Sequence, residues 1–190
     1  MHGLDVRIFH WINQWSPQWS GLFVFFSEAT KDADVRIGIA VIFLLLLGAG
    51  PTTRKAGLTA LATLLVSNSF AEGFKHMFHM LRPCVELDQY ILYVGKLDSF
   101  GTASSHAANM AALAFVFCYY FKWWGIPWAL AAIITGLSRI YVGVHYPSQV
   151  LLGFLCGLFS AFLVIKTWEA FLRMRSSKTL LDPSTGATSR

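Results

Sequence analysis

Charge is scarce in this sequence. Only 13% of its 190 residues are Asp, Glu, Lys or Arg, about half the share found in an ordinary soluble domain. Hydrophobic residues make up 55% of the chain, and its mean hydropathy is +0.53. This shortage of charge excludes an ordinary soluble domain and predicts a protein with several membrane-spanning helices.

Two further shortages exclude other classes of protein. The three cysteines, Cys84, Cys118 and Cys156, lie far apart and lack the spacing of zinc ligands. Basic residues outnumber acidic ones by 15 to 10, but they are scattered between apolar runs and form no single patch. We therefore expect no zinc site and no nucleic-acid partner.

Six apolar segments alternate with polar turns, which predicts an all-α bundle of six transmembrane helices. Upstream, the apolar residues from Leu4 to Trp15 have helical spacing, which predicts an amphipathic helix in the membrane interface or an extension of the first span. The first segment is too short to cross a membrane alone, so its span must include flanking residues or run short. The six segments are Trp19–Phe26, Val35–Gly50, Ala56–Arg82, Ser104–Phe121, Pro127–Val144 and Pro147–Phe171.

Charge placement predicts the orientation. Residues 1–175 are expected to form one domain, and residues 176–190 a polar, disordered cytoplasmic tail. Counted over six spans, most basic residues, including Arg54, Lys122 and Arg173, fall on the side of both termini. The positive-inside rule places that side in the cytoplasm of a bacterial inner membrane. The outward side then receives the ends of the third and fifth helices and the start of the fourth.

Polar side chains interrupt the apolar pattern on this outward side at Lys75 to Arg82, at Ser104 to His106 and at Ser138 to Gln149. A charge at membrane depth is costly and indicates a functional site. Lys75 and Arg82 are two helical turns apart, so they are predicted to project from one side of the third helix. Together with Arg139 they gather three cations, which need an anion between them, and arginine suits phosphate.

Two of the histidines in these clusters, His106 and His145, are candidates for catalysis. His106 follows Ser104 and Ser105 at a helix start, where free N–H groups bind phosphate oxygens, although Ser104 is equally suited to be an ordinary N-cap. His106 is placed to protonate a departing oxygen. His145, beside cations, stays neutral, and one of its ring nitrogens can attack phosphorus. Gln149 can accept a hydrogen bond from the other nitrogen and fix the tautomer.

The three clusters resemble the motifs of the type 2 phosphatidic acid phosphatase superfamily of membrane lipid phosphatases, which are written K-x6-RP, PSGH and SR-x5-H-x3-D. In this chain they read Lys75-HMFHML-Arg82-Pro83, Ala103-Ser104-Ser105-His106 and Ser138-Arg139-IYVGV-His145-YPS-Gln149. The order and the spacing of all three are kept over residues 75–149.

This resemblance implies a metal-independent phosphatase that needs no cofactor. It implies that His145 forms a phosphohistidine, that His106 protonates the leaving alkoxide and that Gln149 orients His145. It also implies a set of residues that hold the phosphoryl oxygens, namely Lys75, Arg82, Ser104, Ser105, Ser138 and Arg139.

The chain departs from the superfamily pattern at three positions. Ala103 and Ser105 stand where the second motif has proline and glycine, and Gln149 stands where the third has aspartate. In a Ser-His-Asp enzyme, replacing the orienting carboxylate by an amide costs about 10⁴ in turnover. A glutamine carbonyl still accepts a hydrogen bond from an imidazole N–H, so we expect an active enzyme with a slower or tuned rate.

Two other classes stay open. A histidine-ligated metal or haem protein would use His76, His79, His106 and His145, although the neighbouring cations would repel a metal ion. A lipid-phosphate-binding protein would keep the pocket and lose turnover through Gln149.

The predicted substrate is a membrane lipid whose phosphate lies in the interface. Isoprenoid diphosphates such as undecaprenyl diphosphate rank first, followed by phosphatidylglycerophosphate or phosphatidate, and then by lipid A 1-phosphate. The apolar stretch YILYVGKL, in the loop from Cys84 to Thr102, is expected either to touch this lipid or to form a hairpin on the surface.

Overall fold

The computed structural model describes residues 2–181, with the side chains of residues 3–176. All regular structure in this range is helical, which confirms the all-α prediction. The helices are α1 (His2–Asn13), α2 (Ser20–Glu28), α3 (Ala33–Gly48), α4 (Pro51–Phe78), α5 (Pro83–Glu86), α6 (Ser105–Phe121), α7 (Ile126–Tyr141) and α8 (Pro147–Leu181), with short 3-10 turns η1 (Pro17–Trp19), η2 (Ala29–Lys31) and η3 (Lys122–Gly125).

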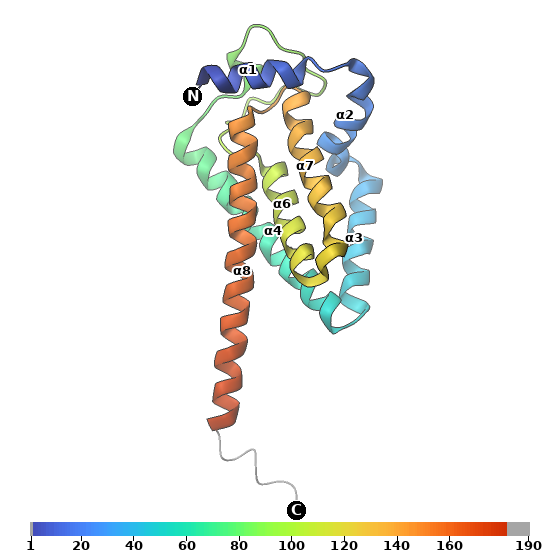
Figure 1. Ribbon diagram of the computed structural model, residues 1–190, viewed down its shortest axis with the longest axis vertical. Coiled ribbons are helices and arrows are strands. Elements are labelled where there is room, and N and C mark those ends of the chain that lie inside the picture. The colour runs from blue at the N-terminus through green and yellow to red at the C-terminus, as the bar shows by residue number, and fades with distance from the viewer. Residues whose placement is uncertain (1, 182–190) are drawn as a thin grey trace, which may run out of the picture.

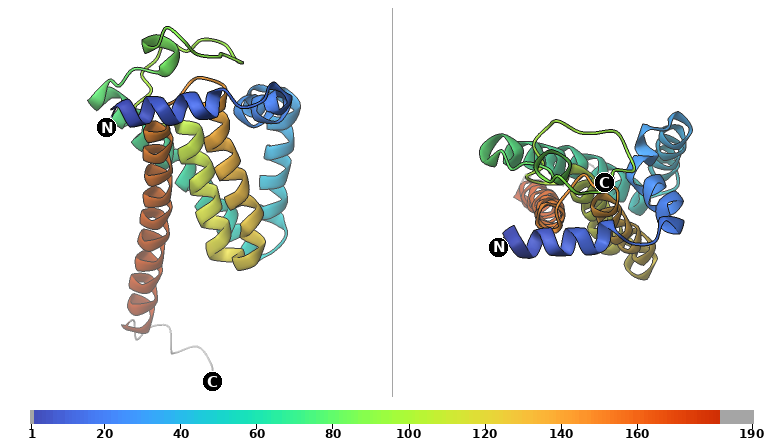
Figure 2. Two further views of the ribbon diagram at one scale, coloured as in Figure 1. Left: turned by 45° about the horizontal axis from the view of Figure 1, so that its top comes forward. Right: turned by 90° about the horizontal axis from the view of Figure 1, so that it is seen from above.

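The long helices α3, α4, α6, α7 and α8 run between two ends of a bundle, and α1 lies across one of these ends (Figure 1). We call this the α1 end, and the opposite one, where η3 joins α6 to α7, the η3 end. Helix α6 is central because it packs against α4, α7 and α8. The connections that lead into α6 and α8 both lie at the α1 end (Figure 2), so they can build one site together.

Helices α6 and α8 approach closely because small residues face each other. A Cβ atom added at Gly157 would lie 2.1 Å from the carbonyl oxygen of Ala108, and one at Gly153 would lie 2.5 Å from that of Ser104. Small residues at such interfaces are typical of helices that pack within membranes. The close approach also lets the Ser104 amide donate to the Gln149 carbonyl at 3.0 Å, which joins the second motif to the third.

Helix α1 is separate from α2, so the expectation that it extends the first span is wrong. The side chain of its last residue, Asn13, is fully buried and donates to the carbonyl oxygens of Ile91 and Tyr141, both at 2.8 Å. The loop after α5 packs through Leu92 and Tyr93 on the hydrophobic core at this end. No strand pairing is found in the described residues of this loop. It therefore packs on this end of the bundle as an irregular segment and does not form the surface hairpin.

Helix α2, which contains the expected first span, does not cross the bundle. It has nine residues, about 13 Å at 1.5 Å per residue, and leads through η2 into α3, which runs towards the η3 end (Figure 1). As a result α1 lies at one end of the bundle and α8 finishes at the other. The prediction that both termini share one side is wrong, because it counted this short helix as a full span.

Two helices end elsewhere than predicted. Helix α4 ends at Phe78 because His79 adopts a left-handed conformation, with φ 48°. Arg82 therefore lies in the following loop, and the prediction that Lys75 and Arg82 project from one helix is wrong. Helix α8 continues to Leu181, past residue 176 where a disordered tail was expected to begin. The rest of that expected tail, residues 182–190, lies outside the described residues.

The outer surface of the bundle is apolar. Among the described residues, only the α8 segment Pro147–Ser176 is both long and apolar enough to cross a membrane by length and composition. The shorter helices nevertheless expose large apolar side chains, with Leu44, Leu45 and Leu65 between 65% and 74% exposed. Water disfavours such a surface and lipid accommodates it.

Candidate active site

The three polar clusters meet at the α1 end of the bundle, with His145 in their midst. This residue belongs to the connection between α7 and α8, and its side chain is buried. Its Nε2 atom lies 2.8 Å from Nη1 of Arg82, and its Nδ1 atom lies 3.1 Å from Oε1 of Gln149. Residues from the first and third motifs are thus in direct contact through one imidazole.

Gln149 determines which nitrogen of His145 carries the proton. Its Nε2 donates to the Leu81 carbonyl at 2.7 Å, so its Oε1 is left to accept, and it also receives the Tyr146 amide at 3.2 Å. An acceptor facing Nδ1 of His145 places the proton on that atom. The lone pair is then on Nε2, the nitrogen that faces the cations.

The surroundings of His145 favour its neutral form. Burial, followed by the charges of Arg82 and Arg139, holds the pKa of His145 well below its usual range. An uncharged imidazole keeps a lone pair for attack on an electrophile. In this structure the Nε2 lone pair accepts a hydrogen bond from Arg82.

Arg82 links the loop that contains His145 to the loop before α6. Its Nε donates to the Ser99 carbonyl at 2.6 Å, and its Nη atoms reach Ser99 Oγ at 3.1 Å, the Phe100 carbonyl at 3.2 Å and the Val144 carbonyl at 3.1 Å. Arg82 has the extended conformation that a following proline favours. Because all three guanidinium nitrogens contact the protein, Arg82 positions His145 as well as adding positive charge.

Lys75 lies near the end of α4 and contacts the start of α6. Its ammonium group donates to Ser105 Oγ at 2.8 Å and to the Glu72 carboxylate at 2.6 Å, and Ser105 in turn donates to Glu72 at 3.2 Å. The hydroxyl that Ser105 adds in place of the motif glycine therefore binds the first motif directly.

Arg139 is almost fully buried, with 2% of its surface exposed. Its Nη1 donates to the Ser27 carbonyl at 3.0 Å, to Ser27 Oγ and to the Glu28 carboxylate at 3.4 Å. Its Nε has no hydrogen-bond partner among the described residues. A buried N–H group without an acceptor is costly, so this nitrogen indicates a place for an oxygen of a bound anion.

The two serines of the second and third motifs hydrogen-bond within their own helices. Ser104 Oγ accepts from the Ala107 amide at 3.4 Å, and Ser138 Oγ donates to the Thr135 carbonyl at 2.7 Å. Both residues are fully buried. Ser104 is thus the N-cap of α6, which confirms one of the two roles expected for it. The phosphate-binding roles of both hydroxyls stay predictions.

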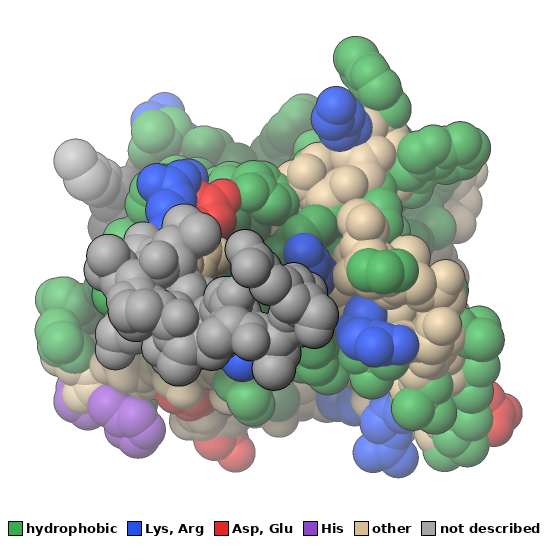
Figure 3. All heavy atoms as spheres, turned by 90° about the horizontal axis from the view of Figure 1, so that it is seen from below, with side chains coloured by type: hydrophobic (Ala, Val, Ile, Leu, Met, Phe, Trp, Pro, Cys, Tyr) green, Lys and Arg blue, Asp and Glu red, His purple; other side chains and the backbone are tan. Residues whose placement is uncertain are grey.

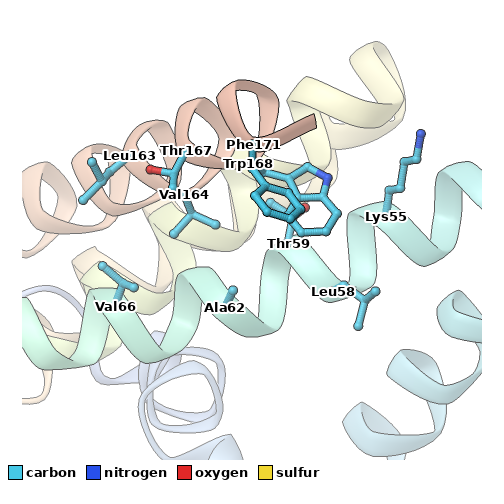
Figure 4. Close-up of a pocket in the computed structure, with 10 residues that line it drawn as sticks. All are labelled: Lys55, Leu58, Thr59, Ala62, Val66, Leu163, Val164, Thr167, Trp168 and Phe171. Atoms are coloured by element: carbon cyan, nitrogen blue, oxygen red, sulfur yellow. The ribbon is translucent and has the colours of Figure 1, made fainter. Parts of the chain in front are cut away.

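His106 opens onto an apolar cavity of about 240 Å³. The cavity lies between α6, α7 and the pair α2 and α3, and follows a stripe on α6 formed by His106, Met110, Leu113 and Phe117. A second, apolar groove of about 670 Å³ lies between α4 and α8, lined by residues such as Leu58, Ala62 and Trp168 (Figure 4). Only the smaller cavity reaches a residue of the three motifs.

The histidines considered as metal ligands do not converge. His76 and His79 are exposed, and His79 packs edge-on against Phe100 with 4.5 Å between ring centroids. Among the described residues, no group of three or more His, Cys, Asp or Glu side chains could hold a metal ion. This arrangement gives no support to the metal or haem alternative.

Several residues of the site lie outside the three motifs. Glu72 belongs to the polar half of α4, and Ser27 and Glu28 come from the end of α2. Their only signal in the sequence is a charged or hydroxyl side chain at the edge of an apolar run. The carbonyl groups of Leu81 and Ser99 carry no signal, because every residue has one.

Gly101 leaves room for the side chains that support His145. A Cβ atom added there would lie 2.7 Å from Gln149 Oε1 and 2.8 Å from Arg82 Cγ. We expect Gly101→Ala to displace one of these side chains and to lower kcat by about tenfold to a hundredfold, the range that a 1 Å misplacement produces. Gly95→Ala is the control, because a Cβ atom there meets nothing within 4 Å. Equal rates for the two variants would contradict this role for Gly101.

The fold and the site define a class of protein: a helical bundle with a lipid-compatible surface and a neutral, buried histidine among three cations at one end. The model of the PAP2 superfamily matches residues 56–173. The chain belongs to the PAP2 superfamily, as its three motifs predicted.

Relatives and solved structures agree with this assignment. The chain is 30% identical over 166 residues to a protein named undecaprenyl-diphosphatase from Sulfolobus acidocaldarius, a match that covers 86% of this chain and 78% of the relative. The fold of this chain is similar to that of Aquifex aeolicus LpxE, with a TM-score of 0.74 and 22% sequence identity. The match covers 86% of this chain and 95% of LpxE. The fold is also similar to that of a transmembrane PAP2 type phosphatidylglycerolphosphate phosphatase from Bacillus subtilis, with a TM-score of 0.70 and 22% sequence identity. This match covers 89% of this chain and 86% of the Bacillus subtilis chain.

Proposed function

We propose that this protein is a metal-independent phosphatase that hydrolyses the phosphate monoester or diphosphate of a membrane lipid. One observation carries the proposal: Gln149 and Arg82 hold the buried His145 with its Nε2 lone pair towards the cationic site. Membership of the PAP2 superfamily and the name of the undecaprenyl-diphosphatase relative support it.

The proposed reaction uses the two histidines, His145 as the nucleophile and His106 as the acid. Nε2 of His145 attacks phosphorus and forms a P–N bond while the bond from phosphorus to the leaving oxygen breaks. The negative charge of the bound phosphate favours the protonated form of His106, which gives its proton to that oxygen, so the lipid alcohol or lipid monophosphate departs. A water molecule that gives a proton to His106 then attacks the phosphohistidine and releases inorganic phosphate. Lys75, Arg82 and Arg139 balance the charge of the phosphoryl oxygens throughout.

The lipid tail belongs in the cavity that begins at His106. The leaving oxygen carries the tail and receives the proton of His106, so the tail must extend from this residue. The stripe of Met110, Leu113 and Phe117 continues along α6 for about 16 Å from His106, at 1.5 Å per residue. A single hydrocarbon chain fits such a path better than a bulky soluble headgroup.

Filling the cavity is expected to discriminate between substrates by tail length. We expect Met110→Trp to lower kcat/KM for a long-chain lipid phosphate by about tenfold, while a short-chain phosphate ester keeps its rate. Ala62→Trp, in the groove of Figure 4, is the control and should leave both rates unchanged. If Met110→Trp slowed both substrates equally, the tail would lie elsewhere.

The bundle is proposed to cross the membrane with α3, α4, α6, α7 and α8, and with the active site facing outward. Lys and Arg side chains are spread over the η3 end (Figure 3). Arg54 and Lys55 lie near the start of α4, Lys122 begins η3, and Arg173 and Arg175 lie near the end of α8. The positive-inside rule then puts the η3 end in the cytoplasm of a bacterial inner membrane. With five crossings, α1 lies on the outer side.

Helix α1 is proposed to lie in the outer interface. Phe9 and Ile12 are buried against the bundle, whereas Leu4, Ile8 and Trp11 are 37% to 67% exposed. An exposed apolar face that includes a tryptophan suits the headgroup region. The predicted apolar face is therefore divided, with one part packing on the protein and the other available to lipid.

Phosphate release from a small panel of lipids in detergent micelles tests the proposal. The panel contains undecaprenyl diphosphate, phosphatidylglycerophosphate, phosphatidate and lipid A 1-phosphate, with undecaprenyl diphosphate expected to react fastest. The wild-type chain should release phosphate with EDTA present, and His145→Ala should not. If folded wild-type protein bound these lipids without releasing phosphate, the non-catalytic binding alternative would replace the enzyme.

A further inference from the structure

Two carboxylates outside the motifs hold two of the cations that the phosphate needs. Glu28 comes from the end of α2 and pairs with Arg139, and Glu72 comes from α4 and pairs with Lys75. The family model begins at residue 56, so Glu28 lies outside its range altogether. Neither glutamate has a role in the proposed reaction.

Glu28 contacts the buried guanidinium of Arg139 from the side of α2. Its Oε1 lies 3.4 Å from Nη1 of Arg139 and also accepts from Ser27 Oγ, while its Oε2 pairs with Lys31. The Arg139 side chain is 3% exposed and that of Glu28 is 23% exposed. Glu28 thus supplies negative charge beside Arg139, at a position that is partly open to solvent.

Glu72 forms the matching contact on the other side of the site. Its Oε1 lies 2.6 Å from the Lys75 ammonium and also accepts from Ser105 Oγ. The Lys75 side chain is 13% exposed and that of Glu72 is 46% exposed. Two of the three Lys75 N–H groups are occupied in this way, by Glu72 and by Ser105.

A bound phosphate has to compete with both carboxylates. Some N–H groups of Lys75 and Arg139 already donate to Glu72 and Glu28, and each carboxylate also repels the negative charge of the phosphate. A cluster of three cations without these carboxylates would bind inorganic phosphate, the last product, more tightly. Tight binding of a product slows its release, which is the slowest step in many enzymes.

We propose that Glu28 and Glu72 are built-in counter-anions that weaken the binding of phosphate to Arg139 and Lys75, so that the product leaves. They are positioning residues, because they act through the two cations. This inference rests on the proposed function for its role in turnover, while its effect on phosphate affinity is independent of turnover.

Calorimetric titration of the full chain in detergent with inorganic phosphate tests the proposal. We expect Glu28→Gln and Glu72→Gln each to tighten phosphate binding by about threefold, as the loss of a partly exposed charge would, and the double variant by about tenfold. Glu28→Asp and Glu72→Asp keep the charge and should bind phosphate like the wild type. In turnover, the glutamine variants should lower kcat and KM together, with stronger inhibition by phosphate.

Glu169→Gln is the matched control. Glu169 pairs with Lys166 across the same three-residue spacing that joins Glu72 to Lys75, but it lies 20 residues along α8 from Gln149, the site residue on that helix. Its replacement should leave phosphate affinity unchanged. Unchanged or weaker binding in the Glu28 and Glu72 variants, an equal change in Glu169→Gln, or no phosphate binding by any variant would overturn the inference. The expected affinities in a chain without turnover would instead refute only the proposed function.

Discussion

Replacing His145 by alanine is expected to lower phosphate release by about 10⁴-fold or more, because the reaction loses its proposed nucleophile. The remaining cations can still bind the substrate, so KM should change far less than kcat. The measurement is the rate of phosphate release from the best lipid of the panel, with purified protein at matched concentration.

The control for this variant separates chemistry from folding. His76 is an exposed histidine on α4, and His76→Ala should keep the wild-type rate. Because His145 is buried between Arg82 and Gln149, the thermal unfolding of the His145→Ala protein should be measured as well. His145→Asn is a second variant, in which a polar side chain replaces the imidazole. A folded His145→Asn protein with more than a hundredth of the wild-type rate would contradict the assignment of the nucleophile.

Replacing Gln149 by leucine should produce the second largest effect, a loss of about 10³-fold in kcat. Leucine cannot accept from Nδ1 of His145 or donate to the Leu81 carbonyl, so the imidazole loses the contact that fixes its tautomer. The comparable change in a Ser-His-Asp enzyme costs about 10⁴, and a smaller loss is expected here because Arg82 still orients the ring.

Ser148→Ala is a neighbouring control for Gln149→Leu. Ser148 is exposed at the start of the same helix, where it contacts Asp5 of α1. Its loss should leave kcat within about twofold of wild type. If the Gln149→Leu protein stayed folded and retained the full rate, the proposed role of Gln149 in orienting His145 would be wrong.

The motifs made the centre of the site predictable from the sequence. Gln149 was expected to accept a hydrogen bond from one ring nitrogen of His145, and its Oε1 lies 3.1 Å from Nδ1 of His145. The helices α6 and α8 begin within a residue of their expected positions, since Ser104 is a good N-cap and Pro147 suits a first turn.

The errors came from features that depend on tertiary structure. Apolar content alone does not tell a short helix such as α2 from a full span, so the two termini were placed on the same side. Helix periodicity also does not reveal the left-handed His79, which ends α4 before Arg82. The contacts of Glu28 with Arg139 link residues that are 111 positions apart, and no local pattern encodes such a distance.

The most direct test of the account is to trap the covalent intermediate. Wild-type protein is mixed for a short time with a lipid substrate labelled in its transferable phosphate, quenched in alkali, which preserves a phosphohistidine, and mapped by peptide mass. The account predicts a phosphoryl group on the peptide that contains His145, and none in His145→Ala. Phosphate released at the full rate with no label on His145, or a label on another residue, would contradict it.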